Sequence, residues 1–434
     1  MQKSLDRKLA AIHADPSGAK DFILADAKDA DMAFGIGAPG RSPEMHAGEV
    51  RMRTLAEYRD NIRQIARQGL VDIMLMSASG NDALTIGERL FENSHVTPAA
   101  RANDASDIFA VRHGRYVGEP ARPFRTASLD HIQCGHVDCS ADERGRGANL
   151  GLYSVTFNNR LDDDLAVLEQ YRTFREEAER KWFRHFLEVF DPNSPHDLTD
   201  EQTPQFINDC IARTLAGVAE AGRPVFLKIV YHGPRAMEEL VAYDPHLVVG
   251  ILGGSAGTTY DAFKLIAEAR KYGARAALFG RKINNAECQL AFVEFLRRIV
   301  DDEITPEEAV RAYHAVLNRL GIAPQRNLAD DMQLQSGVMS YRNASSGQVP
   351  SGIPRGNSSA AAPSSKPTEK PDCGCGGTDP KQCHCHAGPK DSTGVAPPAA
   401  ANSSAATDGQ PDFSRMSVAE KLAYNQARRN RIFG

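Results

Sequence analysis

The sequence predicts an α/β protein whose first 342 residues fold as a (β/α)8 TIM barrel. Eight short runs rich in β-branched and aromatic residues recur along this part of the chain. Helical patterns lie between most of these runs, and such alternation is typical of a parallel sheet. Eight strands in about 300 residues, each followed by a helix or a long loop, fit a barrel.

Each predicted strand is a short apolar run, and several of these runs end in polar or glycine-rich residues. The eight strands are expected at Phe22–Asp26, Val71–Ser77, Thr97–Ala102, Gly151–Phe157, His185–Phe190, Val225–Tyr231, Leu247–Leu252 and Ala276–Phe279. A doubly wound open sheet is the alternative architecture. It explains the strand count less well, and the sequence lacks the glycine-rich fingerprint of a dinucleotide-binding turn.

Apolar residues at helical spacing separate most of the strands and also close the domain. The predicted helices are Leu55–Gln68, Leu161–Lys181, Pro204–Ala221, Ala236–Tyr243, Tyr260–Tyr272, Asn285–Val300 and Pro306–Leu320. The connection after the third strand is unusually long and contains the motif HIQCGHVDC. This motif places Cys134, His136, Asp138 and Cys139 close together. A metal site is one interpretation, and a loop or subunit contact is the other, because the spacing matches no strong pattern.

Composition limits the classes of function. A net charge of −5 argues against a nucleic-acid-binding protein. No apolar run reaches the roughly 18 residues that a membrane span needs, and the polar, amphipathic N-terminus has no signal-peptide core. Four of the eight cysteines lie in the barrel region and four are crowded into the tail. We therefore expect no disulfide framework and a cytoplasmic location.

Residues 343–412 predict a disordered linker, because they are mainly Ser, Ala, Pro, Gly, Asn and Thr and cannot bury a core. The linker contains a cluster of thiols at Cys373, Cys375, Cys383 and Cys385. These thiols could hold a soft metal such as zinc. The alternative is a cysteine-rich linker that binds metal only adventitiously.

Residues 413–434 predict a short amphipathic helix. Ser417 and Glu420 form a capping-box pattern, and Arg428 and Arg431 belong to its basic face. A long linker that ends in such a helix resembles the encapsulation peptides that recruit enzymes into bacterial microcompartments, which implies a shell protein as partner. Attachment to an anionic membrane or a nucleic acid is an alternative, and so is docking back on the barrel.

Lys228 stands inside the predicted sixth strand, where a side chain should be buried. Burying a charge without a partner costs several kcal/mol, so this lysine must be neutralised, paired or used. Lys228 and Val230 share one face of the strand. If that face points into the barrel, desolvation favours the neutral amine, which can attack a carbonyl and form a Schiff base. The alternative is a barrel lysine that pairs with a carboxylate for packing.

Polar and glycine-rich residues follow the next two strands. The seventh strand ends in Gly253, Gly254 and Ser255, and the eighth ends in Gly280 and Arg281. TIM barrels commonly bind phosphate at the loops after these two strands. Glycine allows the backbone to approach phosphate oxygens, and an arginine supplies a bidentate contact. The sequence therefore predicts a phosphate site beside Lys228.

The stretch from Val225 to Leu320 resembles the class I, Schiff-base aldolases of the fructose-bisphosphate, tagatose-bisphosphate and deoxyribose-phosphate aldolase superfamily. The resemblance implies that Lys228 forms the imine and that the glycine loops with Arg281 bind the substrate phosphate. It also implies that Glu188, in the fifth-strand motif FLEVF, lies beside the imine. A first-strand aspartate completes the site; Asp26 is the choice, and Asp29 and Asp31 are competing candidates.

The sequence departs from the family at several strands. Deoxyribose-phosphate aldolases carry a second lysine on strand seven, and VVGILGG has none. Strand four offers only Tyr153, Ser154, Thr156 and Asn158 for assistance. Strands two and three offer Ser77, Ser79, Arg101 and Asn103, which could contact the part of the substrate that carries no phosphate. A second phosphate site is not expected from these sequences.

The resemblance implies a metal-independent aldolase with no cofactor beyond the covalent imine on Lys228. The expected substrate is a ketose 1-phosphate such as L-fuculose or L-rhamnulose 1-phosphate, cleaved to dihydroxyacetone phosphate and an aldehyde. The family also implies a homo-oligomer. A fructose-bisphosphate-type aldolase of central metabolism, or an inactive barrel that acts as a tail-directed scaffold, are the alternative functions.

Overall fold

The computed structural model describes residues 1–46, 49–254 and 257–335 of the 434-residue chain. Ser255, the predicted linker, its cysteine cluster and the predicted terminal helix lie outside the described residues. No helix in the described part of the chain combines the length and the apolar character that a membrane span requires.

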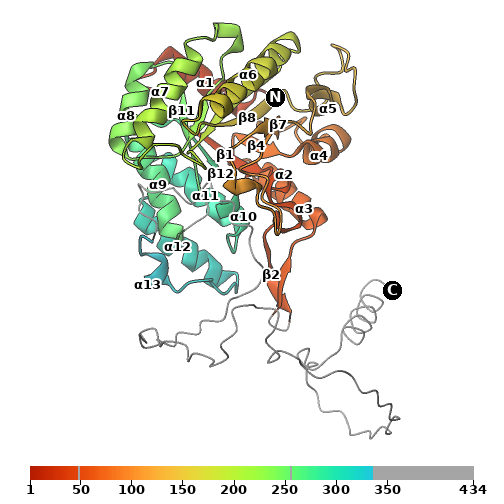
Figure 1. The fold of residues 1–434 in the computed structure, drawn as a ribbon. Helices are drawn as coiled ribbons and strands as arrows, with labels where there is room; N and C mark the ends of the chain where they lie inside the picture. Colours follow the sequence, from red (N-terminus) through yellow and green to blue (C-terminus); the bar gives the residue numbers. More distant parts are fainter. Residues whose placement is uncertain (47–48, 255–256, 336–434) are drawn as a thin grey trace, which may run out of the picture. The chain divides into compact units, whose positions relative to one another are not determined.

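Eight parallel strands close into a barrel, in the order β1, β12, β11, β10, β9, β8, β5 and β4 (Figure 1). Their bounds are Ile23–Lys28 (β1), Ile73–Met76 (β4), Thr97–Arg101 (β5), Leu150–Thr156 (β8), Arg184–Phe190 (β9), Leu227–Ile229 (β10), Val249–Leu252 (β11) and Ala276–Phe279 (β12). Each corresponds to one of the eight predicted strands. The predicted TIM barrel is therefore confirmed, and closure of the sheet excludes the doubly wound alternative.

Helices cover the outside of the barrel and match most of the predicted segments. They are α3 (Leu55–Gln68), α6 (Leu161–Arg180), α7 (Thr203–Leu215), α8 (Pro234–Tyr243), α9 (Thr259–Lys271), α11 (Gln289–Val300) and α12 (Pro306–Arg319). Capping boxes begin α3, α9 and α12 at Thr54, Thr258 and Thr305. Two predicted helices differ from the structure by more than two residues at one end. The predicted helix Pro204–Ala221 ends at Leu215, and the predicted helix Asn285–Val300 begins at Gln289, after a separate turn, α10 (Arg281–Asn284).

The structure also contains several further helices, strands and turns that were not predicted. They are α1 (Ser4–Ala14), α2 (Asp31–Phe34), the hairpin of β2 (Arg41–His46) and β3 (Glu49–Met52), α4 (Ala78–Asn81), a π-helical turn (Asp82–Gly87), β6 (Asp104–Ala105), β7 (Pro123–Phe124), α5 (Leu129–Cys134), α13 (Leu328–Asp331) and the 3₁₀ turns Gly35–Gly37, Tyr116–Gly118 and Glu220–Gly222. The amphipathic N-terminus forms α1, whose apolar residues Leu5, Leu9 and Ile12 pack on the residues that fill the barrel. This helix covers the N-terminal end of the strands.

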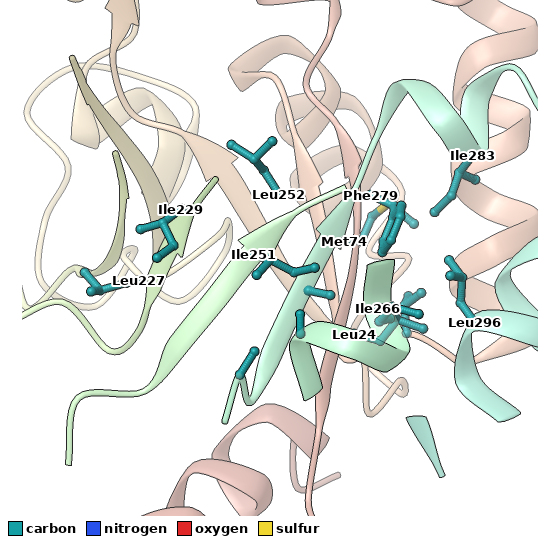
Figure 2. Packing of buried hydrophobic residues seen from close by; sticks show 14 of the residues in the cluster. Leu24, Met74, Leu227, Ile229, Ile251, Leu252, Ile266, Phe279, Ile283 and Leu296 are labelled. Carbon is teal, nitrogen blue, oxygen red and sulfur yellow. The ribbon is translucent and has the colours of Figure 1, made fainter. Parts of the chain in front are cut away.

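The core consists of an inner and an outer layer because strand side chains alternate between two faces. The inner layer contains Ala25 and Ala27 of β1 together with residues of the other strands. The outer layer lies between the strands and the helices, and Figure 2 shows part of it, including Leu227 and Ile229 of β10. Because Leu227 and Ile229 face outward, Lys228 between them faces the barrel interior.

Candidate active site

Lys228 lies in β10 directly opposite Glu188 of β9 in the strand register. Its Nζ is 2.5 Å from Oε1 of Glu188, and the two side chains are only 8% and 1% exposed. At this depth water screens the pair little, so amine and carboxylate interact strongly. The predicted in-strand lysine is thus both buried and paired with the predicted glutamate.

Two further side chains bind the other oxygen of Glu188. Ser154 of β8 donates its hydroxyl to Oε2 over 2.6 Å, and Arg101 of β5 lies 3.4 Å from the same oxygen. The backbone around Ser154 is itself fixed, because the Asn103 amide accepts from its N–H and donates to its carbonyl. Glu188 therefore has a well-defined position next to the amine.

Arg101 joins three strands at this level of the barrel. Its Nε contacts Asp29 over 2.6 Å, and its Nη1 donates to Ser154 over 2.9 Å. Burial alone would lower the pKa of Arg101, but the carboxylates of Asp29 and Glu188 outweigh burial and raise it. The guanidinium is a permanent positive charge between two carboxylates.

A cavity of about 100 Å³ opens at the C-terminal ends of the strands and includes these groups. Its charged lining residues are Asp29, Arg101, Asp107, Glu188, Lys228 and Arg281, and its glycines are Gly253, Gly254 and Gly280. Of the residues predicted to carry out the imine chemistry and to bind the phosphate, the structure thus brings together all except Asp26 and Ser255, and Ser255 lies outside the described residues. Catalytic groups of TIM barrels lie at this same face.

Close packing or backbone conformation also disfavours a larger residue at each of the three predicted glycines. A Cβ at Gly253 would lie 2.1 Å from the Phe279 ring, and one at Gly280 would lie 2.8 Å from the Ala27 carbonyl oxygen. Gly254 has a φ of +59°, which disfavours other residues. Arg281 follows at the start of α10 with its guanidinium carbon 5.2 Å from the centre of the Phe34 ring. Burial lowers the pKa of Arg281, and the Glu188 carboxylate opposes this.

Asp26 does not reach the cavity. It shares the outward face of β1 with Leu24 and pairs with Lys28, whose Nζ lies 2.9 Å from an Asp26 oxygen with both side chains fully buried. Burial raises the pKa of Asp26 and lowers that of Lys28. Asp29, an alternative candidate in the sequence, occupies the cavity instead, because the chain leaves the strand after Lys28.

Asp31, the other alternative, borders a second cavity of about 470 Å³. Ser77 donates its hydroxyl to Asp31 over 2.6 Å, and Ser79, Thr126 and His131 also line this space. The segment of residues 29–34 lines both cavities. Of the residues proposed for the far end of the substrate, Ser77 and Ser79 are therefore here, whereas Arg101 and Asn103 belong to the Glu188 network.

The strand-four candidates are distributed over three environments. Ser154 binds Glu188, and Thr156 donates its hydroxyl to Asp107 over 2.6 Å. Tyr153 faces outward and stacks on Phe174 with the ring centres 4.3 Å apart. Asn158 contacts the loop after β9. Only Ser154 and Thr156 therefore contact residues that line the cavity.

Sequence reasoning missed Lys28 and Asp107. The alternation in ILADAK places Lys28 on the same face as Asp26, and that pattern could have identified the pair. Asp107 follows the short β6 in an irregular loop, where no spacing rule indicates its position.

The HIQCGHVDC segment forms α5 and the loop after it. Cys134 and Cys139 form a disulfide, which the sequence analysis did not predict. His136 and Glu143 lie near Cys134, but Glu143 also contacts Arg146 over 2.8 Å and accepts from Ser140. A disulfide sulfur is not a thiolate ligand, so this form of the loop does not offer the cysteine ligands of a zinc site.

The fold and cavity define a TIM barrel with a buried lysine–glutamate pair at the C-terminal ends of its strands. No family model and no curated protein matches the sequence. Among solved structures, a fructose-bisphosphate aldolase from Slackia heliotrinireducens is similar, with a TM-score of 0.50 and 11% identity over 72% of this chain and 91% of that one. A Schiff-base-forming fructose-1,6-bisphosphate aldolase aligns with a TM-score of 0.48 and 17% identity over 68% of this chain and 99% of that one. At these identities the likeness concerns the fold.

Proposed function

We propose that the protein is a Schiff-base aldolase with Lys228 as its nucleophile. The observation that carries the proposal is the buried contact of 2.5 Å between Lys228 and Glu188 inside the cavity. A lysine–glutamate pair that only stabilises the fold would show the same contact. Such a pair would have no reason to line an open cavity together with Arg281. The likeness to a fructose-bisphosphate aldolase fold supports the same reaction class.

The reaction begins when Lys228 passes a proton to Glu188, which leaves a neutral amine. The amine attacks the ketone carbon C2, and loss of water from the carbinolamine gives an iminium that accepts electrons. With its carboxylate restored, Glu188 removes the proton of the C4 hydroxyl, the C3–C4 bond breaks and an aldehyde leaves. Protonation of the enamine at C3 and hydrolysis release dihydroxyacetone phosphate. No metal takes part in these steps.

Arg281 and the backbone at Gly253, Gly254 and Gly280 bind the substrate phosphate in this proposal. Ser255, which follows Gly254 in the sequence, belongs to the same proposed site. Phosphate binding orients the ketone toward Lys228, so binding energy is used to position the reacting carbon. Asp29 replaces Asp26 as the first-strand acid, and its role is to hold Arg101 and, through it, Glu188.

The residues that line the second cavity favour a leaving aldehyde that carries no phosphate. None of its lining residues in the described part of the chain is a lysine or an arginine, whereas a second phosphate would call for such a group. Hydroxyl and carboxylate groups, by contrast, suit the hydroxyls of a sugar fragment. A ketose 1-phosphate, such as L-fuculose or L-rhamnulose 1-phosphate, is thus favoured over a bisphosphate.

Borohydride trapping tests the proposal. Incubation with a panel of ketose 1-phosphates and borohydride should add the mass of the reduced adduct at Lys228, and Lys228→Ala should abolish it. Lys282 is the lysine to compare with Lys228. Burial lowers the pKa of Lys282 to about 8, so its amine could also react with the ketone. Adduct at Lys282, or activity that survives Lys228→Ala but is lost on adding a chelator, would contradict the proposal.

Two further proposals concern assembly. We infer that residues 413–434 direct the enzyme to a microcompartment shell protein, and that the barrel forms a homo-oligomer in the cytoplasm. Deleting residues 413–434 should then leave turnover unchanged and abolish co-sedimentation with shells. If the barrel is instead an inactive scaffold, no ketose phosphate will be cleaved, and the deletion will remove the whole function.

A further inference from the structure

Asp107 is the acidic group of the Lys228 cavity that the reaction has not used so far. It is fully buried, it follows β6, and it lines the same cavity as Glu188 and Lys228. Its Oδ2 accepts the Thr156 hydroxyl over 2.6 Å. Its Oδ1 is buried and makes no hydrogen bond of ordinary geometry within the described residues.

An unpaired carboxylate oxygen in this position is costly, because burial removes the water that would solvate the charge. Protonation at Oδ1 removes this cost and gives an O–H donor on a residue that lines the cavity. Burial raises the pKa of Asp107, and the Glu188 carboxylate raises it further. The hydrogen bond from Thr156 and the backbone N–H groups of Asp107 and Ile108 oppose this, but the net shift is upward. The described residues show no ion pair to Asp107.

Among the three carboxyl groups of the cavity, Asp29, Asp107 and Glu188, Asp107 is the one for which the described residues provide no cationic partner. Glu188 has an amine, a guanidinium and a hydroxyl as partners. Asp107 accepts a side-chain hydrogen bond from Thr156 alone, and burial raises its pKa. Two carboxyl groups in such different surroundings, one paired with cations and one not, are typical of a base and an acid that share a site.

We propose that Asp107 is the proton donor that expels water from the carbinolamine on Lys228, an inference that rests on the proposed aldolase function. The Asp107 proton passes to the C2 hydroxyl, the C2–O bond breaks, and the nitrogen lone pair forms the iminium. Water leaves, and Asp107 becomes a carboxylate beside the new positive charge. The proton that Glu188 took from the amine returns through this water to Asp107, which restores Glu188 as the base.

The test is the rate of iminium formation, measured as borohydride-trapped protein against time. Asp107→Asn should slow it by about 10²–10⁴-fold, the usual contribution of a general acid, with little change in substrate affinity. The exposed Asp142→Asn is the matched control and should behave as wild type. Because the variant could be damaged structurally, Asp107→Ala is assayed with added formic acid, which should restore part of the rate only if an acid is missing.

The pH profile separates a proton donor from a positioning residue. The wild-type rate should fall as pH rises through the pKa of Asp107, and Asp107→Asn should lose that dependence. The charged groups that share the cavity, Asp29, Arg101, Glu188, Lys228 and Arg281, remain in the variant. Equal trapping rates and equal pH profiles in wild type and Asp107→Asn would overturn the inference about Asp107 and leave the aldolase proposal intact. Failure of wild type to trap any ketose phosphate would overturn the aldolase proposal and this inference with it.

Discussion

The buried pair of Asp26 and Lys28 predicts a distinctive pattern of stability. Each single substitution, Asp26→Leu or Lys28→Met, leaves one charged group without its partner in the outer layer of the core. Because both side chains are 0% exposed, we expect each to lower the free energy of unfolding by about 3–5 kcal/mol. Replacing both residues removes both charges at once, so the double variant should recover stability close to wild type.

The magnitude follows from the surroundings of the pair. The pair faces the outer layer of the barrel, where burial shifts the pKa of each group toward its neutral form. An exposed pair of the same type is worth only about 0–1 kcal/mol. Arg298 and Glu294 on α11 form such a pair at 2.6 Å with both side chains more than 40% exposed. Arg298→Met is therefore the matched control.

The assay is urea unfolding followed by far-ultraviolet circular dichroism for the wild type, the two single variants, the double variant and the control. The coupling energy of the double-mutant cycle measures the interaction directly. A double variant whose loss equals the sum of the single losses would refute the reasoning. A folded double variant without aldolase activity would restore Asp26 as a catalytic candidate.

Two other predictions concern titration and phosphate binding. His185 is buried against Tyr171, and burial lowers its pKa to about 3, so the unfolded chain binds a proton below about pH 6.5 and the folded chain does not. The unfolding free energy should therefore fall by up to about 1.4 kcal/mol per pH unit between pH 6.5 and 3, and His185→Phe should lack this component in acid unfolding curves. Arg281→Ala should raise the KM for a ketose 1-phosphate by about 10–100-fold, roughly 1.4–2.7 kcal/mol, in steady-state assays. An unchanged KM, or an equal loss for an unphosphorylated ketose, would contradict phosphate binding by Arg281.

The sequence was sufficient to predict the barrel because strand alternation and helical spacing are local signals. Lys228 could be identified because it interrupts an apolar run, and the strand register then fixed its direction. Glu188 came from resemblance to a family, and the structure places the two side chains in contact. The prediction for Asp26 failed at the last residues of β1, where the side chains of Asp26 and Asp29 point to different layers and no local pattern marks the end of the strand.

Residues brought into the site by tertiary contacts could not be predicted in the same way. Asp107 follows the short β6, in the irregular connection between β5 and β8, and lines the cavity. The Cys134–Cys139 bond similarly depends on the turn after α5. In both cases the sequence shows a reactive group, but the chain path decides what it faces.

The position of the N-terminal helix α1 bears on the path that substrate and products take. Leu5, Leu9 and Ile12 cover the barrel end opposite the cavity, so substrate and products share the mouth at the C-terminal ends of the strands. In the proposed reaction the three-carbon fragment is still bonded to Lys228 when the aldehyde forms. The aldehyde must therefore depart first through that mouth, and an excess of aldehyde should re-enter and compete with protonation of the enamine. Product inhibition by the aldehyde is the expected result.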